Sequence, residues 1–152
     1  LLVLGTMAER ESRRATALAL TLAAPLIGLG VWLAQPAFEF YRGLSGLDSA
    51  LYGLVCARLI AAGRRERHAF TTVLGGAALV GFAWKCATEI AGGQTVFAEG
   101  ADYVPVPLAH LLGLLAGLAA QALVSRRRAD DAESRPPASG WPCPWRPSSP
   151  GP

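Results

Sequence analysis

Four apolar runs constrain the fold of this chain more than any other feature of its sequence. They occupy residues 15–34, 44–63, 69–91 and 107–124, and charged residues, glycine or proline separate them. A helix of about 20 apolar residues spans the hydrocarbon core of a bilayer. Only 16% of all residues are charged, against about a quarter in an ordinary soluble domain. The sequence therefore predicts an all-α fold, a polytopic bundle with four full transmembrane spans.

The two ends of the sequence differ from these runs. Residues 1–4 are apolar and have the composition of a helix end, so we expect an N-terminal partial helix ahead of the four spans. From residue 129 onward proline, serine and acidic residues prevail, which leaves too little apolar surface to order the chain. We expect a membrane domain over residues 1–125 and a proline-rich, disordered cytoplasmic tail over residues 126–152.

Arginine clusters occur on alternate sides of the spans and predict the topology. One cluster precedes the first span, one lies between the second and third, and one follows the fourth: Arg10, Arg13 and Arg14, then Arg64, Arg65 and Arg67, then Arg126, Arg127 and Arg128. Loops rich in arginine and lysine stay in the cytoplasm. The second and fourth spans then begin at the outer face. Ser45 and His110, near those two starts, are expected to share a depth, since three residues of helix rise by only about 5 Å.

A serine and a histidine at one depth are the minimum for nucleophilic catalysis. A serine hydroxyl is a poor nucleophile until a neighbouring base takes its proton, and His110 is placed to do so for Ser45. Backbone N–H groups at Leu44 and Ser45 could hold the resulting oxyanion. Small residues let helices approach closely in lipid, and glycines flank both side chains. We expect close helix packing at this site through Gly43, Gly46, Gly113 and Gly117.

Other polar residues near these positions receive structural interpretations. Asp48, three residues after Ser45, could orient His110, but a structural hydrogen bond is the favoured interpretation. Lys85 and Glu89 are four residues apart and favour an ion pair within one helix over a gate or substrate contact. The scattered cysteines argue against a metal site. The sequence also lacks the stripe of basic residues interleaved with aromatics that is typical of nucleic-acid binding. We expect no metal, no cofactor and no nucleic-acid partner.

These motifs resemble those of the rhomboid intramembrane serine proteases. The resemblance rests on Gly-Leu-Ser-Gly at residues 43–46 and on Ala-His at residues 109–110, followed by Gly113 and Gly117. Residues 41–48 and the set Lys85, Glu89 and Gly92 resemble the rhombosortase branch, which processes C-terminal sorting tails. The resemblance covers about residues 1–125. It implies a Ser–His dyad, no metal or cofactor, and membrane-anchored protein substrates.

The sequence departs from the family pattern in two respects. Rhomboids have six core helices, so we expect the first helix and most of the second to be missing from this stretch. The second helix normally brings a histidine and an asparagine to the oxyanion, and no residue here is assigned to those roles. Rhomboids often carry a ring four residues after the nucleophile, packed on the histidine. That position is Ser49 here, so Asp48 and Ser49 are candidates for a supporting role only.

We therefore predict an intramembrane serine endopeptidase that uses Ser45 and His110 to cleave membrane-anchored substrates, including C-terminal sorting tails. The expected location is the bacterial inner membrane, with the active-site face outward. Two alternatives stay open. One is a rhomboid-like pseudoprotease that binds transmembrane clients without cleavage, and the other is an unrelated structural membrane subunit. Whether this stretch is active by itself also stays open.

Overall fold

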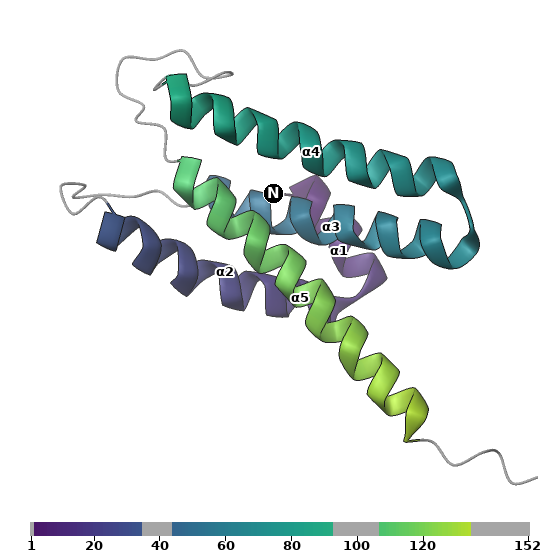
Figure 1. Ribbon diagram of the computed structural model, residues 1–152. Helices are drawn as coiled ribbons and strands as arrows, with labels where there is room; N and C mark the ends of the chain where they lie inside the picture. The colour runs from purple at the N-terminus through teal and green to yellow at the C-terminus, as the bar shows by residue number, and fades with distance from the viewer. Residues whose placement is uncertain (1, 35–43, 93–106, 135–152) are drawn as a thin grey trace, which may run out of the picture.

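The computed structural model describes residues 2–34, 44–92 and 107–134. Over these residues the chain forms five helices and no strand (Figure 1): α1 (Leu2–Glu11), α2 (Arg13–Ala34), α3 (Leu44–Glu66), α4 (Ala69–Gly92) and α5 (Pro107–Glu133). The helices α2 to α5 are long and apolar enough to cross a membrane, whereas α1 has only ten residues. The predicted all-α bundle is confirmed, with four helices of spanning length and a shorter helix ahead of them.

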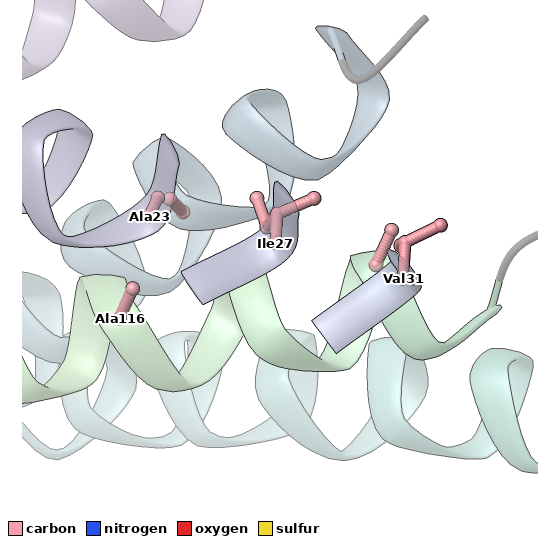
Figure 2. Packing of buried hydrophobic residues seen from close by; sticks show 6 residues of the cluster. Ala23, Ile27, Val31 and Ala116 are labelled. Atoms are coloured by element: carbon pink, nitrogen blue, oxygen red, sulfur yellow. The ribbon is translucent and has the colours of Figure 1, made fainter. Parts of the chain in front are cut away.

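Helix α3 is the centre of the bundle. Its most extensive contacts are with α5, which also packs along α2, while α4 lies mainly against α3 and touches α5 only lightly. Alanines dominate the core, and Figure 2 shows Ala23, Ile27 and Val31 on successive turns of α2 beside Ala116 of α5. Because most of these side chains are small, the helix backbones lie close together. Dispersion contacts between close backbones hold helices together in lipid, where the hydrophobic effect gives no drive between them.

Glycines bring α3 and α5 into backbone contact. A Cβ atom at Gly113 would overlap the Gly46 carbonyl, and one at Gly117 would overlap the Ala50 carbonyl. A Cβ atom at Gly53 would lie 2.8 Å from the carbonyl oxygen of Leu114. No side chain larger than hydrogen fits these places without separation of the two helices. The α3–α5 contact therefore runs from the Ser45 end of α3 to its middle.

Arg58 of α3 connects α1, the junction between α1 and α2, and α5 at the opposite half of the bundle. Its guanidinium donates hydrogen bonds to the carbonyl oxygens of Ala8 (2.9 Å) and Ser12 (3.4 Å) and to Gln121 Oε1 (3.2 Å), and lies 3.5 Å from Glu11 Oε2. The last carbonyls of α1 have no partner within their own helix, and a cation at a helix C-terminus is favourable. Arg58 is thus a structural residue, about 20 Å along α3 from Ser45.

Two further features bear on the membrane. Helix α5 continues to Glu133, beyond residue 124 where we expected the span to end, because arginine and alanine favour helix even where they no longer favour lipid.

Helix α4 exposes large apolar side chains, among them Phe70, Val80 and Trp84. A soluble protein rarely exposes such a continuous apolar face, but lipid would cover it. Residues 135–152 of the expected tail lie outside the described residues.

Candidate active site

A cavity of about 830 Å³ opens at the end of the bundle where α3 and α5 begin and α4 approaches its end. Ser45 and His110 both line it, although they are on different helices. Asp48, Ser49 and Tyr52 line the α3 side, and the α4 side contributes Gly81, Phe82, Trp84, Lys85 and Thr88. The cavity thus brings the sequence-predicted serine and histidine together with a polar group from α4.

The α3–α5 packing places Ser45 and His110 at one level. A Cβ atom on Gly46, the residue after Ser45, would lie 3.1 Å from the carbonyl oxygen of Ala109, the residue before His110. No hydrogen bond joins Ser45 to His110 in the described part of the chain. Catalytic hydrogen bonds are often long before the substrate binds and tighten in the reactive complex. The structure thus places both residues in the lining of one cavity, at the adjacent ends of two helices in backbone contact.

Helix α3 presents backbone donors beside its serine. It begins at Leu44, and the first four N–H groups of a helix have no acceptor within it. The N-terminal end of the helix dipole also favours negative charge. Leu44 and Ser45 thus carry N–H groups suited to an oxyanion, next to the half-buried Ser45 side chain. Gly43, which we expected to contribute to packing here, lies outside the described residues.

Ser49 occupies the position where the rhomboids that this sequence resembles often carry a ring. Its hydroxyl donates a hydrogen bond to the Ser45 carbonyl oxygen at 2.9 Å, and its side chain is buried. A Cβ atom on Gly113 would lie 3.2 Å from the Ser49 Cβ, so α5 closes directly over this position. A ring at residue 49 would therefore separate α3 from α5. The serine allows the close approach that sets His110 beside the cavity.

A ring from α4 lies beside His110 instead. The Phe82 ring is 6.4 Å from the His110 ring, edge to face, and it also stacks on Tyr52 at 5.1 Å. The Tyr52 hydroxyl donates to the Ala78 carbonyl oxygen at 3.0 Å, which ties α3 to α4. Our sequence analysis missed Phe82 and Tyr52. One signal was available for Tyr52, since it lies two helical turns after Ser45, on the same face of α3.

Glu89 lies near two nitrogen-bearing side chains. Its Oε1 lies 2.7 Å from Lys85 Nζ, the ion pair that the spacing favoured, and its Oε2 lies 3.9 Å from His110 Nδ1. The side chain is only 3% exposed, so the carboxylate faces the bundle and not the lipid. The contact with His110 crosses from α4 to α5 and was not expected from the sequence. Asp48 lines the same cavity from α3.

The comparison with protein families identifies the family of the chain. The family model described as Rhomboid domain matches residues 1–127, which include the five helices up to the last turns of α5. No curated protein and no solved structure matches the chain. The matched region holds the four apolar spans of an integral, multi-pass membrane protein. The chain belongs to the rhomboid family, whose members are typically intramembrane serine proteases that act on substrates within the bilayer.

Proposed function

We propose that this protein is an intramembrane serine endopeptidase in which Ser45 is the nucleophile and His110 the general base. The observation that carries the proposal is the shared cavity, which Ser45 lines from the first turn of α3 and His110 from the first turn of α5. Three further features support it: the backbone contact of Gly46 with Ala109, the free N–H groups at the start of α3, and membership of the rhomboid family.

The chemistry follows from these positions. Ser45 Oγ attacks the carbonyl carbon of the scissile peptide, and His110 takes the hydroxyl proton. The N–H groups of Leu44 and Ser45 stabilise the oxyanion of the tetrahedral intermediate. The C–N bond breaks as His110 returns the proton to the leaving amine, which leaves an acyl ester on Ser45. Water, deprotonated by His110, then hydrolyses the ester and restores both side chains.

The substrates are membrane-anchored proteins, cleaved in or next to their transmembrane segment. The cavity suits such a segment, because Tyr52, Phe82 and Trp84 line it together with small and polar groups. We assign the C-terminal sorting tails of exported proteins as the substrate class, on the resemblance of residues 41–48 to the rhombosortase branch. Asp48 and Ser49 act on the structure of the site and not on the substrate.

The active-site end of the bundle faces outward from the bacterial inner membrane. All three arginine clusters belong to the opposite helix ends, including Arg64 and Arg65 in the last turn of α3, and arginine-rich ends stay cytoplasmic. In a variant without native cysteines, a membrane-impermeant thiol reagent should label a cysteine at Glu99 in intact cells but not one at Arg65. The reverse labelling pattern would invert the topology.

A fluorophosphonate probe tests the nucleophile directly in membranes that contain the full-length protein. An activated serine displaces fluoride: the Oγ–P bond forms, the P–F bond breaks, and the histidine takes the hydroxyl proton. We expect mass spectrometry to locate the phosphonyl group on Ser45 alone, and labelling to disappear in His110→Ala. Labelling of another serine would mean that Ser45 is not the nucleophile. Complete absence of labelling would favour the rhomboid-like pseudoprotease.

A further inference from the structure

The outer ends of α4 and α5 hold three side chains in a row. The Glu89 carboxylate lies between the Lys85 ammonium and the His110 imidazole, with one oxygen toward each: Oε1 at 2.7 Å from Nζ and Oε2 at 3.9 Å from Nδ1. The row therefore joins a charged pair on α4 to the ring that we assign as general base. Its order fixes which nitrogen of His110 faces the carboxylate.

The burial of Glu89 indicates more than an ion pair along one helix. A pair formed only for mutual neutralisation could lie at the helix surface, yet Glu89 is 3% exposed, and Lys85 is 25% exposed. A buried ion pair adds little net stability, because desolvation offsets the attraction. Helix α4 has only two other buried residues, Gly75 and Cys86, in its described length. The carboxylate is thus one of the few groups that α4 directs into the bundle.

His110 needs a hydrogen-bond partner at its Nδ1 atom. Its Nδ1 atom is buried and has no hydrogen-bond partner among the described residues. A buried N–H without an acceptor costs about 1–3 kcal/mol. The gap to Glu89 Oε2 is 3.9 Å, about 1 Å longer than a hydrogen bond. A hydrogen bond requires these two atoms to approach by about 1 Å, and the Phe82 ring lies 6.4 Å from the imidazole ring, edge to face.

The tautomer of His110 decides whether it can act as a base toward Ser45. A neutral imidazole carries one proton, and the hydrogen bond at one nitrogen determines which nitrogen holds it. Donation from Nδ1 to Glu89 keeps the proton at Nδ1. Nε2 is then free to take the proton of Ser45 Oγ–H as the Oγ–C bond forms. The carboxylate also stabilises the imidazolium until its Nε2 proton passes to the leaving amine.

We propose that Glu89 is a positioning residue that converts the serine–histidine pair into a Ser45–His110–Glu89 triad, with Lys85 holding the carboxylate in place. The proposal rests on the proposed function, since it assigns how the general base of that reaction is oriented. The acidic member comes from α4, which packs mainly against α3 and also touches α5. The three members therefore come from three different helices.

Glu89→Gln tests this assignment, because the amide has nearly the shape of the carboxylate but no charge. The whole contribution of general-base catalysis is about 10²–10⁴-fold. Loss of orientation alone should thus slow fluorophosphonate labelling of Ser45 and lower kcat by about 10- to 100-fold, with KM within about twofold of the wild-type value. Glu89→Asp should recover part of the rate. Glu66→Gln, an exposed glutamate at the far end of α3, is the matched control.

The double variant Lys85→Met/Glu89→Gln separates loss of orientation from misfolding. It removes both charges of the buried pair, so no unpaired ammonium destabilises the fold. It should show the same loss of kcat at unchanged thermal stability. A wild-type rate in this variant and in Glu89→Gln would overturn the triad. The same loss in Asp48→Asn alone would transfer the orienting role to Asp48. Failure of the proposed function gives a different result, because the wild-type protein would then not be labelled at Ser45 at all.

Discussion

Replacement of Ser45 by alanine is expected to abolish cleavage of a membrane-anchored substrate, with a fall in kcat of about 10⁴-fold or more. The substitution removes the oxygen that we assign as the nucleophile. Ser45 is half-buried in the first turn of α3, so the loss of one hydroxyl there should leave the fold intact. The measurement is the conversion of a substrate with a C-terminal sorting tail by the full-length protein in proteoliposomes, followed by immunoblotting.

His110→Ala should inactivate to a similar degree, because a serine without its base is a weak nucleophile. Asp48→Asn should keep substantial activity if that carboxylate has the structural role that we favour. Expression and membrane insertion of each variant serve as controls for folding. Cleavage that persists in Ser45→Ala would show that another residue is the nucleophile. If the wild-type protein cleaves none of the candidate tails, the pseudoprotease becomes the better assignment.

The four spans could be predicted from the sequence because length and hydropathy alone determine them. Each predicted run lies within one observed helix. The juxtaposition of Ser45 and His110 in one cavity also follows from simple geometry. Both residues begin helices that run in the same direction, and the glycines at Gly46 and Gly113 mark the faces that meet. In membrane proteins, patterns of small residues indicate which helix faces meet better than patterns of apolar residues do, since lipid-facing and buried surfaces are equally apolar.

The orientation of α4 could not be predicted for the same reason. Most of its faces are apolar, and few of its residues are buried, so no pattern tells which side meets α5. The sequence could pair Lys85 with Glu89 by their spacing, but it could not show that the second carboxylate oxygen faces His110. Phe82 was overlooked because the family pattern directs attention to the position of Ser49. The ring that contacts His110 comes from another helix.

Charged residues near the arginine-rich end were also hard to interpret. Arg58 precedes the cluster at the end of α3 and has the same chemistry, yet it is buried and bonded to two backbone carbonyls and Gln121. Hydropathy cannot distinguish an arginine outside the bilayer from one that donates hydrogen bonds to carbonyl oxygens inside the bundle. Likewise, the arginines from residue 126 onward end the apolar run but not α5. Hydropathy marks the boundary of the lipid, and helix propensity marks the end of the helix.

Gly117→Ala is expected to have the largest effect on stability. A Cβ atom at this position would overlap the Ala50 carbonyl and lie 2.9 Å from the Leu54 amide nitrogen. Both are backbone atoms of α3, which no change of rotamer can move, so the two helices must separate along their most extensive contact. We expect the free energy of unfolding to fall by at least about 3 kcal/mol, the upper end of ordinary overpacking costs. Thermal unfolding in detergent measures this loss of stability.

Gly28→Ala is the matched control, because a Cβ atom on that glycine of α2 would meet no atom within 4 Å. Alanine there should leave stability unchanged or raise it slightly, since alanine favours helix by about 0.5–1 kcal/mol over glycine. The Gly117 variant should also lose fluorophosphonate labelling, because the cavity that holds Ser45 and His110 depends on the same α3–α5 contact. Equal unfolding temperatures for the two variants would contradict the close packing of α3 and α5. Normal stability with lost labelling in Gly117→Ala would show that the site needs a closer helix approach than the fold does.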